Sequence, residues 1–255
     1  MRHIKLALQY DGSGYSGWQI QAKGATVQGL LEEALFAVTG ERTRVTGAAR
    51  TDAGVHALEQ VAAFNTGALL GPQIYVRALN AGLPDDIRVI SAEECDAGFH
   101  PRYDARNKTY SYLISFHGNY SAFLKRYSWS MPYKLNIDAM REAAQCLAGT
   151  HDFASFRASG CSSKHPVRTI HGIEIAGSAS IEFIGLQFHA PVIRIGIQAN
   201  AFLRHMVRNI VGTLVEIGRG RSSPESMKEI LESRDRKTAG RTAPACGLFL
   251  EKITY

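Results

Sequence analysis

The residues of this sequence whose types and spacing could do chemistry stand together in the run Gly47–Ala57. Within this run, Arg50, Thr51 and Asp52 follow small apolar residues, and the strand-like segment Gln60–Asn65 comes soon after them. A carboxylate and a guanidinium between segments that favour burial cost free energy unless they are paired or take part in a reaction. Asp52 is therefore a candidate nucleophile or electrostatic stabiliser.

A second concentration of charge lies on the apolar segment 201–217, which carries Arg204, His205 and Arg208. Hydrophobic residues recur there at helical spacing, so the pattern predicts a helix on which Arg204 and Arg208 share a face. Such a face is usually a solvated basic surface, but an arginine beside a core needs an anionic partner. Asp52 is a candidate for that partner.

Two other patterns suggest cofactors or metals and are weaker. Gly12–Gly17 matches GxGxxG, but a dinucleotide site needs a helix that opens within the glycines, and here residues 18–24 intervene. We therefore expect a glycine-rich loop that presents Tyr15 and Trp18, with no nucleotide cofactor. The nine histidines and four cysteines show no metal-binding spacing, so we expect no metal, no disulfide framework and a reducing, cytoplasmic setting.

The composition is that of a soluble globular protein with an excess of positive charge. The 255 residues carry a net charge of +6, and the basic residues are mostly arginine, which favours phosphate contacts and base stacking. A basic enzyme without a polyanionic partner remains an equal alternative on charge alone. Tyr110 and Tyr112 alternate on an expected strand, where they serve cross-strand packing or, beside Arg102, Arg106 and Lys108, a base-stacking platform.

The periodicity predicts two halves of similar element order, residues 1–104 and 105–255. In the first half we expect helices at 26–39 and from Pro72, and strands at 3–10, 43–49, 59–66 and 87–92, an order that resembles a ferredoxin-like or RRM-like unit. In the second half we expect helices at 137–148, 201–217 and from Ser223-Pro224, and strands at 108–115, 168–176, 181–188, 192–199 and 247–255.

Several separated motifs, in order along nearly the whole chain, resemble those of the tRNA pseudouridine synthase A family. They are Tyr10-Asp11-Gly12, Gly17–Gln21, Arg50–His56, Leu79-Asn80, Leu83-Pro84, Lys108–Tyr110, Tyr112, Gly149–Phe153, Ser155-Phe156, Phe202–Gly212, Ala243–Ala245 and Gly247-Leu248. The resemblance implies an α+β fold in which two RRM-like, ferredoxin-like halves form a continuous, mostly antiparallel sheet flanked by helices.

The resemblance also implies an activity and a set of partners. The family's members are cofactor-free isomerases (intramolecular transferases) that convert uridine to pseudouridine in the anticodon stem and loop of tRNA, at tRNA positions 38, 39 and 40. They bind tRNA and no membrane, and work as homodimers in the cytoplasm. Residue by residue, the resemblance makes Asp52 the nucleophile, Arg208 its pairing and orienting partner, and Tyr110 the residue that stacks on the base. Arg50 and Leu248 would bind substrate, Arg50 in the space left by a flipped base.

The alternative is a non-catalytic RNA-binding protein built from paired RRM-like folds. Such a protein would explain the basic charge and the aromatic residues. It would leave the Arg50-Thr51-Asp52 unit unexplained, and the sequence lacks the RNP1-type run that RRM domains place on a central strand.

Overall fold

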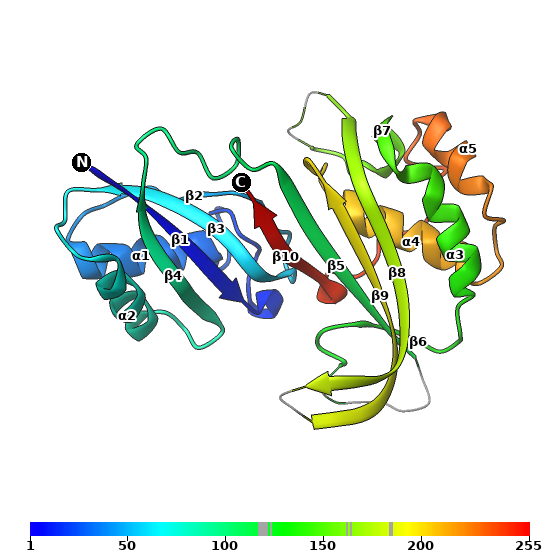
Figure 1. Ribbon diagram of the computed structural model, residues 1–255, viewed down its shortest axis with the longest axis horizontal. Coiled ribbons are helices and arrows are strands. Elements are labelled where there is room, and N and C mark those ends of the chain that lie inside the picture. Colours follow the sequence, from blue (N-terminus) through cyan, green and yellow to red (C-terminus); the bar gives the residue numbers. More distant parts are fainter. Residues whose placement is uncertain (117–121, 123, 162, 164, 184–185) are drawn as a thin grey trace. The chain divides into compact units, whose positions relative to one another are not determined.

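The computed structural model describes residues 1–116, 122, 124–161, 163, 165–183 and 186–255. These residues form two compact units (Figure 1). The first unit contains Met1–Arg106 and Phe249–Tyr255, and the second contains Asn107–Leu248. The boundary between 104 and 105 that the sequence suggests stays a prediction about domains. Among the described residues, no helix combines the length and the apolar character needed to cross a membrane.

The first unit is built on a sheet with the strand order β4-β1-β3-β10. Its elements are β1 (Arg2–Tyr10), η1 (Gly12–Gly14), α1 (Val27–Thr39), β2 (Thr46–Gly47), β3 (His56–Thr66), α2 (Pro72–Gly82), β4 (Ile87–Cys95) and, at the end of the chain, β10 (Leu248–Thr254). Strand β1 is antiparallel to β3 and β4, and β10 is parallel to β3. The short β2 pairs with β3.

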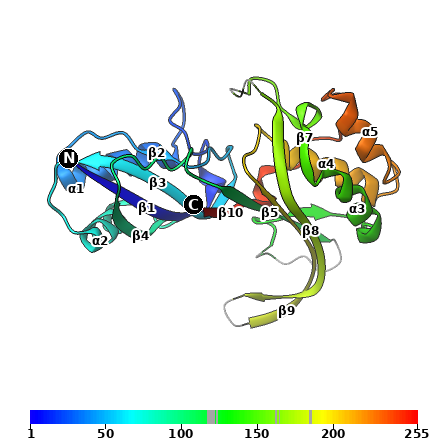
Figure 2. The same cartoon turned by 45° about the horizontal axis from the view of Figure 1, so that its top comes forward.

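Helix α1 matches the expected range 26–39 except that Thr26 is its cap and not its first residue. The Thr26 side chain accepts a hydrogen bond from the backbone of Gly29, and Gly40 closes the helix in the left-handed conformation that favours glycine. Both helices lie beside the strands in Figure 2. Tyr75 of α2 packs edge to face on Phe64 of β3, with ring centroids 5.5 Å apart. Alternate residues of β1 face this core because side chains of a strand alternate between its two faces.

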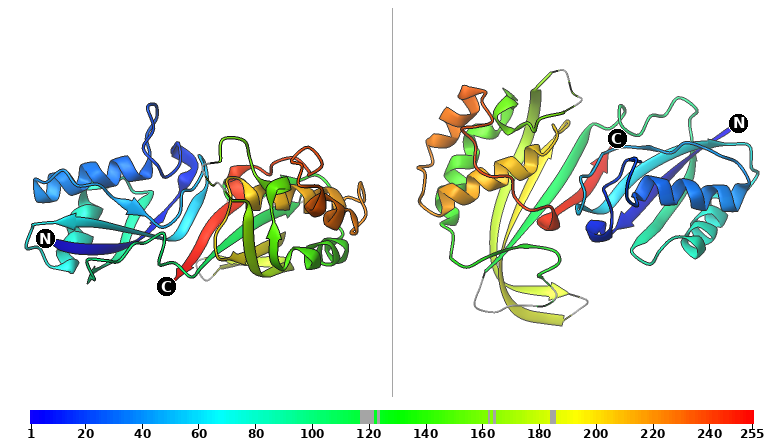
Figure 3. Two further views of the ribbon diagram at one scale, coloured as in Figure 1. Left: turned by 90° about the horizontal axis from the view of Figure 1, so that it is seen from above. Right: turned by 180° about the vertical axis from the view of Figure 1, so that it is seen from behind.

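In the second unit the strands follow the order β5-β9-β8-β7. Its elements are β5 (Asn107–Phe116), β6 (Trp129–Met131), α3 (Ile137–Ala144), η2 (Gln145–Leu147), β7 (Gly149–Asp152), η3 (Ala154–Phe156), β8 (Val167–Phe183), β9 (Leu186–Ala199), α4 (Met206–Gly218), α5 (Ser226–Ser233) and η4 (Ala245–Gly247). Strands β8 and β9 form a long curved hairpin, and α3, α4 and α5 gather on one side of it (Figure 3).

The strands of this hairpin are longer and fewer than the sequence suggests. The expected strands 168–176, 181–188 and 192–199 are two continuous strands, β8 and β9, and residues 184–185 of the middle one lie outside the described residues. The expected strands leave a gap at residues 177–180. In the structure these residues continue the pairing with β9 through an irregularity between Ser178 and Ser180, and the cross-strand pairing satisfies their backbone.

Two helices of the second unit begin later than expected. Helix α4 starts at Met206 instead of residue 201, because His205 has φ of 60°, which no right-handed helix accommodates. Arg204 therefore precedes the helix, and the expectation that it shares a helical face with Arg208 is wrong. Helix α5 begins at Ser226 instead of at the expected Ser223-Pro224, and Glu225 occupies its cap position.

The fold class is the one that the sequence indicates. The structure is α+β, with a large mixed, mostly antiparallel sheet flanked by helices. Helix α4 is buried on almost all sides, so it forms part of the hydrophobic core of the second unit.

Candidate active site

Asp52 lies in the short irregular segment between β2 and β3 of the first unit. Its side chain is half-buried, whereas Thr51 is buried and Arg50 is exposed. The backbone N–H of Val55 donates to the carbonyl of Asp52 at 3.1 Å, and Gly54 has φ of 77°. The chain thus makes a tight turn directly after Asp52, and this turn requires a glycine.

A buried side-chain network fixes the backbone in front of Asp52. The Gln60 carboxamide donates to the carbonyl of Ala49 at 2.8 Å and accepts from its N–H at 3.1 Å. The Tyr10 and Thr51 hydroxyls lie 2.8 Å apart, and Gln60 Nε2 also reaches the Tyr10 hydroxyl at 3.5 Å. Burial raises the pKa of Tyr10 to about 12, so its hydroxyl stays protonated at neutral pH. These hydrogen bonds fix Ala49 and Thr51, the residues on either side of Arg50.

The glycine-rich loop packs against the turn that carries Asp52. A Cβ on Gly12 would lie 1.9 Å from the carbonyl oxygen of Val55, and a Cβ on Gly17 would lie 2.6 Å from that of Thr51. The backbone N–H of Trp18 donates to the same Thr51 carbonyl at 3.1 Å. These glycines therefore serve a close approach of two backbone segments.

The aromatic residues of the glycine-rich loop are buried, which corrects the expectation that the loop presents them. Tyr15 and Trp18 are 8% and 3% exposed. The Tyr15 hydroxyl donates to the carboxylate of Asp86, and the indole of Trp18 covers Gly47 of β2. Both rings therefore stabilise the glycine-rich loop that packs against the turn of Asp52.

Tyr110 lies in β5 of the second unit, opposite Ile197 of β9. The ring is 7% exposed and meets Phe202 edge to face, with centroids 5.0 Å apart. Phe202 belongs to the irregular segment before α4, so the late start of that helix brings an aromatic ring onto Tyr110. The neighbouring Tyr112 is fully buried, and burial raises its pKa well above the usual range for tyrosine.

Arg208 and Leu248 are connected through the segment Ala243–Leu248. Arg208 Nε donates to the carbonyl of Ala243 at 2.7 Å, and the N–H of Ala243 donates back to the carbonyl of Arg208 at 3.0 Å. Further along, the Tyr112 hydroxyl donates to the Pro244 carbonyl at 2.9 Å. The segment is thus fastened to both α4 and β5, and it ends at Leu248, which is 5% exposed.

The five residues selected from the sequence therefore fall into two groups. Arg50 and Asp52 stand in one turn of the first unit, and Tyr110, Arg208 and Leu248 belong to the second unit, on elements tied to one another. Sequence reasoning assigned no supporting role to Gln60 or to Thr51. The signal for Gln60 is a lone amide in an otherwise apolar strand, which needs buried partners.

Known relatives place the chain in a family. The sequence profile described as tRNA pseudouridine synthase matches residues 6–104 and 143–255. Proteins named tRNA pseudouridine synthase A from Pelobacter propionicus and a Thermoanaerobacter species are 45% and 43% identical over 255 residues, which is 100% of this chain and of each relative. The protein of that name from Myxococcus xanthus is 41% identical over 100% of this chain and 92% of its own length.

The chain belongs to the tRNA pseudouridine synthase family. The resemblance noted from the motifs is confirmed, and membership makes the protein an isomerase that forms pseudouridine in tRNA. A chain of the archaeal box H/ACA Nop10–Cbf5 complex shares 14% identity with a TM-score of 0.31, over 83% of this chain and 44% of that chain, a likeness too weak to support an argument.

Proposed function

We propose that this synthase isomerises uridines at neighbouring positions of the anticodon stem and loop of tRNA, with Asp52 as the nucleophile and without a cofactor. The observation that carries the proposal is the setting of Asp52. Its backbone is fixed on both sides by buried hydrogen bonds and close glycine contacts, while its own side chain stays half-buried. Such a fixed but accessible carboxylate fits covalent catalysis.

The reaction needs no net oxidation or reduction. The bond between the ribose C1′ and uracil N1 breaks, the base turns, a bond forms between C1′ and C5, and C5 loses its proton while N1 gains one. Asp52 would supply an electron pair to the sugar or the base and recover it when the new bond forms. In this proposal Arg208 pairs with Asp52 and orients its carboxylate, because a guanidinium favours the charged form of an acid.

Three further residues would hold the substrate. Tyr110 would stack on the uracil and keep the detached base in place. Its fixed position in β5 and its contact with Phe202 support that role. Leu248 would pack against the other face of the base. A target within a stem must leave the base stack at a cost of a few kcal/mol, and the exposed Arg50 would fill the space it leaves.

The remaining parts of the proposal concern the setting. We expect the enzyme to work in the cytoplasm as a homodimer on tRNA, with the anticodon arm as its target. The net charge of +6 supports binding of a polyanion. Membership in the family of tRNA pseudouridine synthases disfavours the alternative of a non-catalytic RNA-binding protein.

The test is pseudouridine mapping on tRNA incubated with purified enzyme in the presence of a chelator. Wild-type protein should modify uridines of the anticodon arm, and Asp52→Asn should lower the rate by roughly a thousandfold or more while tRNA binding persists. Asp96→Asn is the matched control, because Asp96 is an exposed carboxylate of the same unit. Normal turnover by the Asp52 variant would overturn the assignment of the nucleophile, and modification outside the anticodon arm would overturn the target.

A further inference from the structure

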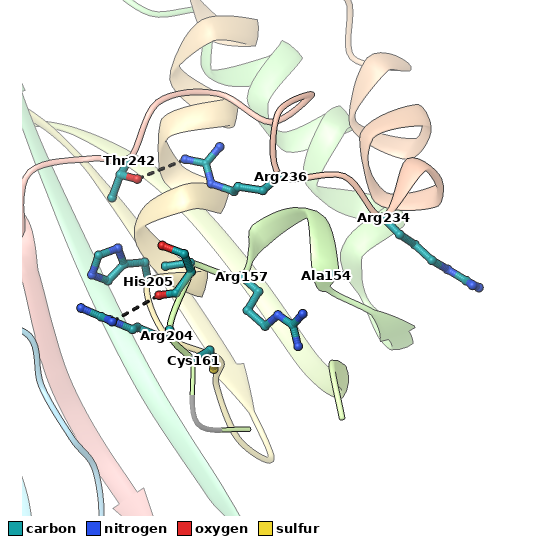
Figure 4. Close-up of a pocket in the computed structure, with 11 residues that line it drawn as sticks. Ala154, Arg157, Cys161, Arg204, His205, Arg234, Arg236 and Thr242 are labelled. Atoms are coloured by element: carbon teal, nitrogen blue, oxygen red, sulfur yellow. Dashed lines mark hydrogen bonds between the residues drawn. The ribbon is translucent and has the colours of Figure 1, made fainter. Parts of the chain in front are cut away.

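A cavity of about 770 Å³ lies in the second unit (Figure 4). Its walls are η3 and the loop after it, the residues directly before α4, and the loop after α5. Four arginines line it, namely Arg157, Arg204, Arg234 and Arg236. None of the described residues that line it is aspartate or glutamate, so the wall is strongly basic.

Two of these arginines are held in place by neutral oxygens. Arg236 donates to the Asn209 side chain and to the Thr242 hydroxyl, both at 3.1 Å, and Arg204 donates to the carbonyl of Ser159 at 3.2 Å. Neutral acceptors fix the direction of a guanidinium but leave its charge uncompensated. Asn209 is fully buried, so Arg236 rests on a rigid support.

The loop that carries Ser159 is shaped around Arg204. Gly160 has φ of 69°, and a Cβ there would come within 3.1 Å of the Arg204 guanidinium. The N–H of Ala158 also donates to the carbonyl of Arg204 at 3.0 Å. Hydrogen bonds with both the backbone and the side chain of Arg204 therefore hold this loop against the residues directly before α4.

Arg157 and Arg234 have different surroundings. Arg234 Nε lies 3.5 Å from the carboxylate of Asp152, and in Figure 4 its side chain extends away from the others. Arg157 is half-exposed, and within the described part of the chain its side chain has no hydrogen bond or ion pair. Arg157 is therefore the arginine of this wall with the most unused capacity for an anion.

These features fit one class of ligand. Guanidinium groups bind phosphate oxygens in pairs of parallel hydrogen bonds, and the arginines approach from three separate segments. The volume is that of sites for ligands of nucleotide size rather than for a single ion. We propose that this cavity binds backbone phosphates of the RNA substrate, with Arg157, Arg204 and Arg236 as the donors. The proposal rests on the proposed function, because it takes tRNA as the substrate.

The test measures tRNA affinity and steady-state rates for Arg157→Gln across a series of salt concentrations. Loss of one phosphate contact should weaken binding roughly fivefold near physiological salt and reduce the slope of log K against log salt by about one. KM should rise with kcat unchanged, because the proposed contacts are with phosphates of the RNA backbone and not with the reacting base. Arg157→Lys, which keeps the charge but loses the paired hydrogen bonds, should fall between wild type and Arg157→Gln.

Lys228→Gln is the matched control, since it removes one positive charge from an exposed site on α5 of the same unit. Equal affinity and salt slope for the Arg157→Gln and Lys228→Gln proteins would overturn the proposal. Modification of tRNA by the wild-type enzyme outside the anticodon arm would instead overturn the proposed function, so the two failures are distinguishable. In a second arm at constant ionic strength, inorganic phosphate competes with tRNA. Phosphate that binds to the wild type but not to Arg157→Gln, with tRNA affinity equal in both, would assign the cavity to a free anion and overturn the RNA proposal.

Discussion

In the first unit, Tyr10, Gln60 and two glycines fix the backbone on both sides of Asp52 through buried bonds and contacts closer than any Cβ would allow. In the second unit, the arginines of the basic cavity are directed by carbonyl and amide oxygens while their charged groups line open space. The first arrangement limits the movement of one carboxylate. The second keeps positive charge available.

This difference matches two demands of the proposed reaction. A nucleophile must be held within a fraction of an ångström, because small displacements cost large factors in rate. Contacts with a nucleic-acid backbone act through charge, tolerate small displacements and contribute mainly to affinity. We therefore expect defects around Asp52 to lower kcat, and defects in the basic cavity to raise KM.

The strongest way to break this comparison is Gly12→Ala. Its new Cβ would overlap the Val55 carbonyl, so the glycine-rich loop and the turn after Asp52 must separate. We expect a loss of about 2–4 kcal/mol of stability and a marked fall in kcat. Gly14→Ala is the control, because nothing lies within 4 Å of a Cβ there. Thermal unfolding and steady-state kinetics measure both effects, and equal behaviour of the two variants would refute the role of the close contact.

A second change, Gln60→Leu, removes the amide that bonds Ala49 in two directions. The buried N–H and carbonyl of Ala49 then lose their partners, at a cost of about 2–3 kcal/mol, and we expect kcat to fall more than KM changes. Gln9→Leu makes the same chemical change at an exposed position of β1 and should be nearly neutral. A change confined to KM would contradict the view that Gln60 positions Asp52.

On the side of the second unit, Thr242→Val tests the support of the basic cavity. The Thr242 hydroxyl donates to Asn209 at 2.7 Å and accepts from Arg236. Valine keeps the shape and loses both bonds, so we expect about 1 kcal/mol of destabilisation and a rise in KM at constant kcat. A fall in kcat alone, measured with saturating tRNA, would show that the cavity serves the chemistry as well.

The smallest effect concerns alkaline pH. Burial raises the pKa of Tyr10 to about 12, so the folded state favours the protonated phenol. This contribution to the free energy of unfolding is fully present below the pKa of tyrosine in the unfolded chain, near 10, and is lost as pH rises toward the folded-state pKa of about 12. Raising the pH from 9 to 11 should therefore lower the free energy of unfolding by about 1 kcal/mol through Tyr10. The free energies of unfolding of wild type and Tyr10→Phe, measured with denaturant, should differ less at pH 11 than at pH 9. The same difference at both pH values would contradict the raised pKa of Tyr10.

Much of the fold follows from local patterns. Gly40 ends α1 as predicted, the helix begins at Val27, one residue after the expected start, and the apolar run after Leu58 is a buried strand. The start of α4 was predicted wrongly, because helical spacing of apolar residues continues through Phe202, whose ring instead packs on Tyr110. The hairpin of β8 and β9 was divided wrongly, because glycine, serine and proline suggest turns locally even where a paired strand satisfies the backbone.

The sequence by itself determined the family, through motifs that require no structure to recognise, and with the family it determined the reaction. It also indicated the α+β class and the residues proposed for the chemistry. Only the tertiary structure decided why Gly12 must be glycine, what holds Ala49 and Thr51, and that Arg157, Arg204 and Arg236 share one wall. The physical reason is the separation along the chain over which each effect acts. Propensities and spacing act over a few neighbouring residues, whereas burial, close backbone contact and converging charge arise between residues tens of positions apart in the chain.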